Sequence, residues 1–225
     1  MMVLPHSFLS ELLLVVSGIG CFGDAQADTV LPEPDHPSPP GGIQTAVLAG
    51  GCFWGVDAVF KHVKGVIRVV SGYAGGTAET AHYDIVCSGR TGHAESVEIT
   101  FDSSIVAFST ILRVFFSVAH DPTQIDRQGP DTGPQYRSAI FYVTEEQHVT
   151  AKAYIDQLNR AHIFQKPIAT QIAPLEAFYP AEDFHQNFLE DHPTYPYIVY
   201  HDLPKLKALK KLYPSLWHSS TPTVS

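Results

Sequence analysis

Cysteine is scarce in this chain, and the stretch from Ser88 to Ser225 contains none. The three cysteines, Cys21, Cys52 and Cys87, form no Cys-x-x-Cys pair. Neither a structural zinc site nor a disulfide scaffold is therefore indicated. The 12 histidines are scattered, and no His-x-x-x-His pair is joined by a third ligand at usable spacing. We expect no metal site.

Positive charge is also in short supply. The net charge is −9 and the sequence has no basic patch able to follow a phosphate backbone, so nucleic acid is not an expected partner. Four lysines near the C-terminus fit the solvated face of a short helix: Lys205, Lys207, Lys210 and Lys211. At 225 residues the chain has room for one substantial domain, which we expect to be monomeric.

The N-terminus lacks the lysines or arginines that usually begin an export signal. It does carry an apolar stretch from Leu12 to Phe22, followed by the small-x-small sequence Ala25-Gln26-Ala27. We predict a signal peptide over residues 1–27 and a periplasmic or secreted protein. Lipid modification at Cys21 stays an alternative, and a protein without a working signal would be cytoplasmic. The apolar run is too short for a convincing membrane span.

Proline and glycine dominate residues 28–43, which predicts an extended linker. The folded domain is expected at 44–203 and a tail at 204–225. Strands are expected at 45–49, 66–70, 94–101, 136–143 and 168–172, and helices at 53–63, about 103–116, 144–162 and 181–190. Gly72 to Gly76 reads as a turn. This order predicts an α+β fold, a two-layer sandwich of ferredoxin-like type with a mixed sheet and helices on one face.

The most informative stretch runs from Gly50 to Gly55 and has Cys52 at its centre. It joins an apolar strand to a segment of helical period. A cysteine at a helix N-terminus lies where backbone N–H groups and the helix dipole favour an anion, so we expect a lowered thiol pKa and a nucleophile. Taken alone, Cys52 is equally compatible with a buried structural cysteine among core aromatic residues.

Glu95 is the second candidate. In the strand 94–101 it shares its face with Val97, Ile99 and Phe101, whereas Glu98 points to water. A carboxyl group on an apolar face has a raised pKa and can act as a general acid. The alternative is a strand-end glutamate that reaches solvent or pairs with Arg90.

Tyr83 and Tyr136 are candidate hydroxyl donors, and Asp131 lies in a loop broken by glycine and proline. Taken singly, each also fits a turn or core position.

Together these residues resemble type A peptide methionine sulfoxide reductases. Seven blocks follow one another in the family's order from about Thr45 to Leu203. They are Gly51-Cys52-Phe53-Trp54-Gly55, Gly72-Tyr73-Ala74-Gly75-Gly76, Tyr83 through Cys87-Ser88-Gly89, Thr91-Gly92-His93-Ala94-Glu95, His120-Asp121-Pro122-Thr123, Asp131-x-Gly133-x-Gln135-Tyr136-Arg137-Ser138 and Ala181-Glu182-Asp183-Phe184-His185-Gln186.

The resemblance implies a role for each candidate residue. Cys52 would attack the sulfur of methionine sulfoxide, and Glu95 would protonate its oxygen. Tyr83 and Tyr136 would hydrogen-bond that oxygen, and Asp131 would help to hold the site.

The resemblance also implies that Phe53 and Trp54 form the apolar pocket for the substrate methyl group, with preference for the S epimer. Release of methionine would leave a sulfenic acid on Cys52. No bound metal, flavin or nicotinamide is implied. The substrates would be oxidised proteins or free methionine sulfoxide, and the activity would repair oxidative damage.

One feature departs from the family pattern, since many members carry resolving cysteines near the C-terminus. Here Cys87 is the only other thiol in the domain, and we expect it to be buried and inert. An external thiol, either thioredoxin or glutathione with glutaredoxin, would then reduce the Cys52 sulfenic acid. Two other functions stay open. A cysteine hydrolase would use His93 or His185 as base, and a binding module would hold sulfoxide-bearing peptides without turnover.

Overall fold

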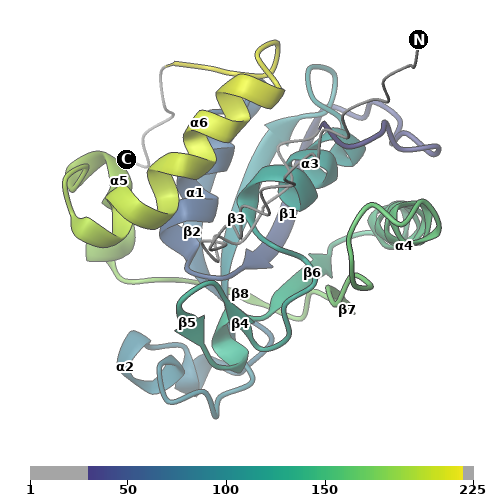
Figure 1. Ribbon diagram of the computed structural model, residues 1–225. Coiled ribbons are helices and arrows are strands. Elements are labelled where there is room, and N and C mark those ends of the chain that lie inside the picture. The colour runs from purple at the N-terminus through teal and green to yellow at the C-terminus, as the bar shows by residue number, and fades with distance from the viewer. Residues whose placement is uncertain (1–29, 220–225) are drawn as a thin grey trace, which may run out of the picture.

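The computed structural model describes residues 30–219, which contain eight strands and six α-helices (Figure 1). The strands are β1 (Ile43–Gly50), β2 (Val66–Ala74), β3 (Ala94–Asp102), β4 (Arg127–Gln128), β5 (Asp131–Thr132), β6 (Ser138–Tyr142), β7 (Gln171–Pro174) and β8 (Phe178–Pro180). The helices are α1 (Phe53–Lys61), α2 (Tyr83–Val86), α3 (Phe108–Val114), α4 (Glu145–Arg160), α5 (Phe188–Asp191) and α6 (Leu203–Leu212).

Six strands form one sheet in the order β7-β6-β1-β3-β2-β8. All neighbours in this sheet are antiparallel except β6 and β7, which are parallel and joined through α4. The short strands β4 and β5 pair separately as a hairpin. The α+β class and the mixed sheet are confirmed, and the ferredoxin-like classification stays a prediction.

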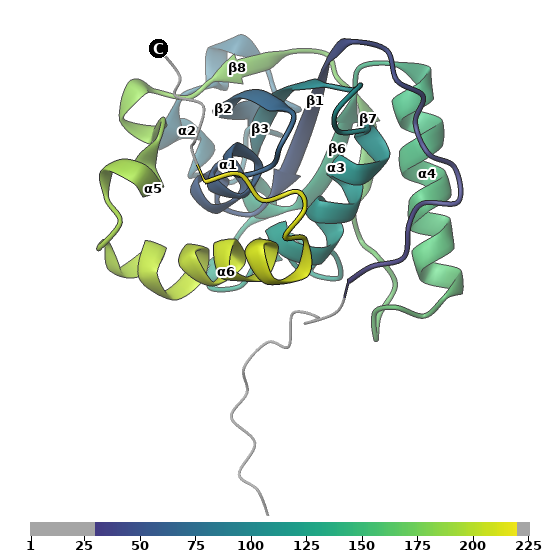
Figure 2. The same ribbon diagram turned by 90° about the horizontal axis from the view of Figure 1, so that it is seen from above.

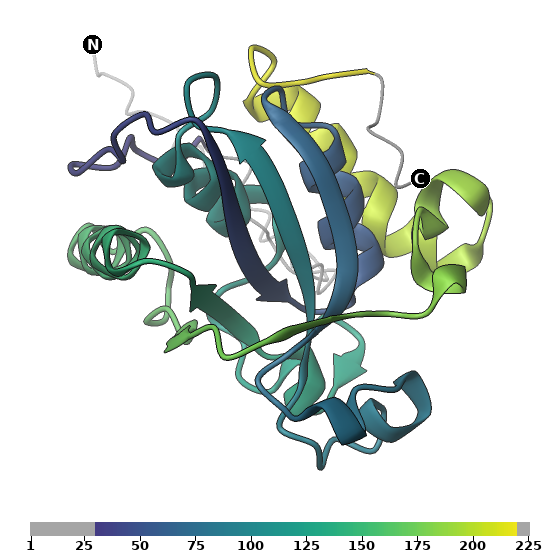
Figure 3. The same cartoon turned by 180° about the vertical axis from the view of Figure 1, so that it is seen from behind.

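The two faces of the sheet are covered differently. Residues of α1, α3, α4 and α6 pack with Ala46 and Leu48 of β1 in one large apolar cluster, and Figure 2 shows α1, α3 and α6 together on one side of the strands. Val47 and Ala49, which alternate with these residues along β1, belong to a smaller cluster on the opposite face. Leu175 and Phe178 pack against that cluster, where the segment between β7 and β8 crosses the sheet (Figure 3).

The patterns around the catalytic candidates predict their elements well. Helix α1 begins directly after Cys52, and β3 begins one residue before Glu95. The predicted cap of α4 is also confirmed, because the backbone N–H of Gln147 donates to Thr144 Oγ1 at 3.2 Å.

Other predictions are wrong. The segment from Gly72 to Ala74 continues β2 instead of turning, because it pairs with β3 up to Ala94. Helix α3 begins only at Phe108, and Ile105, expected on its apolar side, is 65% exposed. Residues 181–190 form a 3₁₀ turn (Asp183–His185) and the beginning of α5 instead of one helix.

Both ends of the described chain pack against the domain more closely than the sequence suggested. In the proline-rich segment before β1, Leu31 is 1% exposed, its N–H donates to the Tyr213 hydroxyl at 3.3 Å, and Tyr154 donates to the carbonyl of Pro32 at 2.9 Å. Helix α6 lies beyond the expected boundary at residue 203, yet it buries Leu209 in the core. Buried apolar side chains such as Leu31 and Leu209 hold the two segments against the core. Neither segment has a strong hydrophobic periodicity of its own.

The predicted signal peptide over residues 1–27 lies outside the described residues. Within residues 30–219, no helix has the length and apolar character needed to cross a lipid bilayer.

Candidate active site

Cys52 lies between the end of β1 and the first turn of α1, as predicted, and is the N-cap residue of that helix. Gly51 before it has a φ of +90°, a conformation that favours glycine. A Cβ atom on Gly51 would lie 2.5 Å from the Cβ of Gln128, so the β4–β5 hairpin closes tightly over this turn. The turn therefore fixes the half-buried thiol at the junction of strand, helix and hairpin.

The predicted lowering of the Cys52 pKa is wrong. Burial raises the pKa of the Cys52 thiol well above its ordinary value, and the carboxyl groups of Glu95, Asp202 and Asp131 raise it further when they are ionised. The N–H of Trp54 in the first turn of α1 opposes this effect, but it is outweighed. At rest the thiol is therefore protonated.

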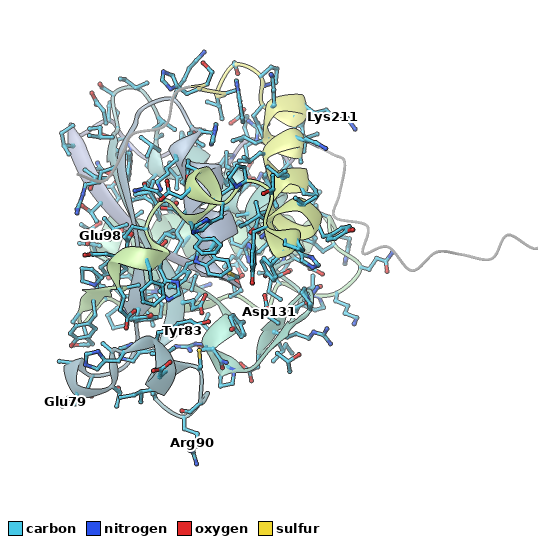
Figure 4. The ribbon with its side chains drawn as sticks, turned by 90° about the vertical axis from the view of Figure 1, so that its left-hand side faces the viewer. Glu79, Tyr83, Arg90, Glu98, Asp131 and Lys211 are labelled. Carbon is cyan, nitrogen blue, oxygen red and sulfur yellow. The ribbon has the colours of Figure 1, made fainter. Side chains whose placement is uncertain are left out.

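Glu95 lies beside Cys52, on the buried face of β3 opposite Tyr73. Its side chain is 3% exposed, and its Oε2 accepts a hydrogen bond from the N–H of Phe53 at 3.1 Å. Burial raises the pKa of Glu95 to about 8 despite that bond. Near neutral pH the carboxyl group therefore holds a proton, as a general acid requires. The alternative partner Arg90 lies at the margin of the molecule in Figure 4, away from this site.

Tyr83, Tyr136 and Asp131 come from three separate segments to the same site. Tyr83 begins α2, Tyr136 ends a 3₁₀ turn (Pro134–Tyr136), and Asp131 lies in β5. Burial, followed by nearby negative groups that include Glu95 and Cys52, raises the pKa of both tyrosines, so both hydroxyls stay neutral donors. In Figure 4, Tyr83 and Asp131 both lie toward the middle of the view.

Phe53 and Trp54 differ in their surroundings. Phe53 is 1% exposed and packs against Tyr73 and His185 inside the core. Trp54 is half-buried and stacks on Phe188 with ring centroids 3.7 Å apart. Of the two, Trp54 is the side chain with an accessible apolar surface for a substrate.

Two residues without a predicted role complete the site. The Tyr197 hydroxyl donates to Asp131 Oδ2. Glu182 accepts from the Tyr73 hydroxyl and from the N–H of Tyr83, both at 2.9 Å, and so ties α2 to β2. Glu182 lies in the last of the seven sequence blocks described above, Ala181 to Gln186. No sequence motif around Tyr197 indicated that it belongs to the site.

A carboxylate–lysine pair was also missed. Asp202 is 1% exposed, and its Oδ1 accepts a hydrogen bond from Lys205 Nζ at 3.1 Å. The i,i+3 spacing of opposite charges was the only available signal. The charge of Asp202 acts on the Cys52 thiol, which places the pair near the nucleophile.

The prediction that Cys87 is buried is wrong. This residue is exposed at the end of α2, and the apolar neighbour that is buried is Val86. Partial burial and nearby carboxylates raise the pKa of the Cys87 thiol, and the interaction with the Tyr83 hydroxyl opposes this rise. Cys87 therefore touches the site through Tyr83.

The two histidines considered for a hydrolase are engaged elsewhere. His93 Nε2 bonds to the carbonyl of Thr77 at 3.0 Å. His185 Nδ1 accepts from the indole N–H of Trp54 at 3.2 Å. Among the hydrogen bonds of residues 30–219, none joins a histidine to Cys52. Neither His93 nor His185 is therefore placed as an imidazole base hydrogen-bonded to Cys52.

Cys52 also lines a cleft of about 750 Å³ that opens between the loop after residue 120 and the start of α6. Tyr197, His201, Lys205 and Lys166 line the same cleft. Glu95, Tyr83 and Tyr136 are not among its lining residues. Within the described part of the chain, no group of three or more His, Cys, Asp or Glu side chains is arranged to hold a metal ion.

A thiol, a protonated carboxyl group and two neutral hydroxyls converge here. This set can deliver a sulfur nucleophile and a proton to a polar S–O group, whose oxygen the hydroxyls can bind. It lacks the histidine base that ester or amide hydrolysis by cysteine usually needs.

Comparison with known proteins gives a consistent picture. The family model described as peptide methionine sulfoxide reductase matches residues 44–216. The chain is 57% identical over 176 residues to the peptide methionine sulfoxide reductase MsrA 2 of Mesorhizobium japonicum, covering 78% of this chain and 90% of that protein. It is 53% identical over 172 residues to MsrA 2 of Synechocystis, covering 76% and 80%.

Solved structures agree. Reduced Mxr1 from Saccharomyces cerevisiae matches with a TM-score of 0.62 at 29% identity, covering 70% of this chain and 90% of that one. Methionine sulfoxide reductase A of Corynebacterium diphtheriae matches with a TM-score of 0.58 at 34% identity, covering 72% and 85%. The chain therefore belongs to the type A peptide methionine sulfoxide reductases, oxidoreductases that use thiols to return the S epimer of methionine sulfoxide to methionine.

Proposed function

We propose that Cys52 and Glu95 carry out the reduction together. The sulfur of Cys52 attacks the sulfoxide sulfur while Glu95 donates its proton to the sulfoxide oxygen, and the proton lost by the Cys52 thiol restores the Glu95 carboxyl group. The oxygen passes to Cys52 as a sulfenic acid, and the substrate sulfur, reduced by two electrons, leaves as methionine. The observation that carries this proposal is the buried Glu95 carboxyl group, which hydrogen-bonds to the first turn of the helix that Cys52 caps.

The remaining residues bind the substrate in this proposal. Tyr83 and Tyr136 donate hydrogen bonds to the sulfoxide oxygen, and their raised pKa values support this role because they keep both hydroxyls protonated. Asp131, held by Tyr197, keeps the pocket wall in place. Trp54 and Phe53 receive the substrate methyl group, as the half-buried surface of Trp54 supports.

The central test follows each epimer of methionine sulfoxide separately with dithiothreitol as reductant. Wild type should reduce the S epimer, Cys52→Ser should be inactive, and Glu95→Gln should lose on the order of 100-fold in rate. Glu98→Gln on the same strand is the matched control. Turnover by Cys52→Ser at the wild-type rate, or reduction of the R epimer alone, would overturn the assignment.

We further propose a one-cysteine cycle. The domain has no cysteine after Cys87, so an external thiol, thioredoxin or glutathione with glutaredoxin, reduces the Cys52 sulfenic acid. After one turnover without reductant, dimedone should label Cys52, and Cys87→Ser should retain most of the dithiothreitol-driven activity. A Cys52–Cys87 disulfide found by mass spectrometry would contradict this cycle. Cys87 is exposed, so its thiol is accessible for such a reaction.

Two broader proposals rest on the sequence, and a third rests on the strand order. Residues 1–27 direct export, and N-terminal sequencing of the mature protein should begin near Asp28, whereas an intact Met1 would argue for a cytoplasmic enzyme. The enzyme repairs oxidised proteins, or reduces free methionine sulfoxide, as a monomer.

The central strands form a ferredoxin-like core, which the antiparallel order β6-β1-β3-β2 supports, with β7 and β8 added at the edges.

A further inference from the structure

We propose that Lys205, held by Asp202, is a catalytic residue of the second half of the cycle, in which it draws the thiolate of a small anionic thiol through the cleft onto the Cys52 sulfenic acid. This inference rests on the one-cysteine cycle and names the class of reductant that it takes.

The pair lies directly beside the first turn of α1. A Cβ atom on Gly55, three residues after Cys52, would lie 2.1 Å from Asp202 Oδ1 and 2.6 Å from Lys205 Nζ. Only the missing side chain at Gly55 lets both charged groups approach this turn. Helix α6 lies next to α1 in Figures 1 and 2, and Lys205 and Cys52 line the same cleft.

Asp202 is built to hold the lysine. It ends a single π-helical turn (Ile198–Asp202), an irregularity that is often found at functional sites. Its side chain makes no capping hydrogen bond to α6, and its buried Oδ2 has no hydrogen-bond partner. A carboxylate buried with one oxygen unpaired is costly, so helix capping does not explain its position.

Lys205 presents its charge to the cleft. Among the described residues its side-chain hydrogen-bond acceptor is Asp202, and an ammonium group has three N–H donors. Two N–H groups therefore remain for a ligand. The other titratable groups lining the cleft are Cys52, Asp121, Lys166, Tyr197, Tyr200 and His201.

Two ammonium groups lie at the cleft even though the whole chain is at −9. The lining residues include two lysines and one carboxylate, Asp121, whose oxygens already accept hydrogen bonds from Thr123 and Gln124. Asp202, which is not a lining residue, adds a second carboxylate behind Lys205. A volume of about 750 Å³ lies within the range of sites for small molecules. The cleft thus fits a thiol of tripeptide size that carries carboxylates.

The reductant thiolate attacks Cys52 Sγ, an S–S bond forms, and the Sγ–O bond breaks. The departing hydroxide takes up the proton that the thiol lost and leaves as water. A second thiolate then attacks the reductant sulfur, which releases Cys52 and a disulfide of the two reductant molecules. Because only the thiolate attacks, a nearby ammonium that stabilises it speeds the first step.

The test forms the Cys52 sulfenic acid with one equivalent of hydrogen peroxide, so that it does not depend on the sulfoxide. The decay of dimedone-reactive Cys52 is then followed after addition of glutathione or uncharged 2-mercaptoethanol at several pH values. Lys205→Met should slow reduction by about tenfold or more near pH 7, with a larger deficit for glutathione, and should move the pH profile to higher pH. Lys205→Arg should keep most of the rate, and Asp202→Asn should share the deficit.

The control Lys207→Met, on the exposed side of the same helix, should behave as wild type. The inference fails if Lys205→Met reduces the Cys52 sulfenic acid at the wild-type rate, or if Lys207→Met is as slow as Lys205→Met in this step. It also fails if Lys205→Met and Asp202→Asn lower the rate of sulfoxide reduction by the same factor as the rate of sulfenic acid reduction. If wild type does not reduce methionine sulfoxide but recycles its peroxide-made sulfenic acid in a Lys205-dependent way, the proposed function fails and this inference stands.

Discussion

Burial of the Glu95 carboxyl group bears both on its proposed role as an acid and on the stability of the protein. This group is buried without a cation, and the single N–H of Phe53 does not compensate for lost hydration. The folded protein therefore favours the protonated acid. The same environment that keeps Glu95 protonated, as its proposed role requires, penalises the folded state once Glu95 ionises.

The stability of the protein should reflect this cost. The pKa of Glu95 is about 8 in the folded protein and has an ordinary value of 4.5. Because the folded pKa is raised, the Glu95 contribution is most favourable below pH 4.5, is lost as the pH rises from 4.5 to 8, and is constant above that. Glu95→Gln should exceed wild type by at least about 1 kcal/mol in unfolding free energy at pH 8.

Urea unfolding of both proteins between pH 4.5 and 8.5 measures this difference, which should widen with pH. Glu98→Gln, which removes a half-buried carboxylate 3.9 Å from Arg68, is the control. A difference between Glu95→Gln and wild type that does not change with pH would show that Glu95 is not held protonated.

At the scale of elements, the packing of α6 on α1 organises the site. Gly55 faces Asp202 and Lys205 at distances that no side chain tolerates. Glycine within a helix normally costs about 1 kcal/mol relative to alanine. At position 55 glycine is needed because a side chain there would clash with Asp202, which lies at the start of α6.

Gly55→Ala should therefore destabilise the protein by about 2 kcal/mol or more, the reverse of the usual effect in a helix. Denaturant unfolding measures the change. Combining it with Asp202→Ala should recover part of the loss, because the closest clashing atoms are then removed. Additive losses in the double variant would show that the contact with Asp202 is not the cause.

The whole molecule is held together by segments that lie outside the sheet. The stretch before β1 runs across the domain surface, where Arg113 Nε donates to the carbonyl of Leu31 at 2.7 Å and Leu31 itself is buried. At the other end, Tyr213 after α6 receives the N–H of Leu31. The two ends of the described chain thus stabilise each other.

Leu31→Ala should lower the unfolding free energy by about 2–3 kcal/mol, as for other buried leucines. Val30→Ala, at a position that is 45% exposed, should change it by less than about 0.5 kcal/mol. Thermal or urea unfolding of the two variants distinguishes the cases. Equal small effects would mean that residues before β1 form a linker, as their composition first indicated.

The sequence by itself determined the family, and it indicated Cys52 as the nucleophile and Glu95 as the acid. Cys52 and Glu95 stand in short local patterns, a strand–glycine–helix junction and a strand of alternating polarity, which fix their positions without long-range information. The same patterns predicted β1, α1, β3 and the cap of α4.

Only the tertiary structure decided the charge state of Cys52, the exposure of Cys87 and the place of Lys205. A pKa depends on burial and on charges from distant segments, and Asp202 lies far from Cys52 in sequence. The docking of residues 30–42 and α6 likewise depends on a few apolar contacts with the finished core. Such contacts have no period along the chain, because the partners they need are supplied by the rest of the fold.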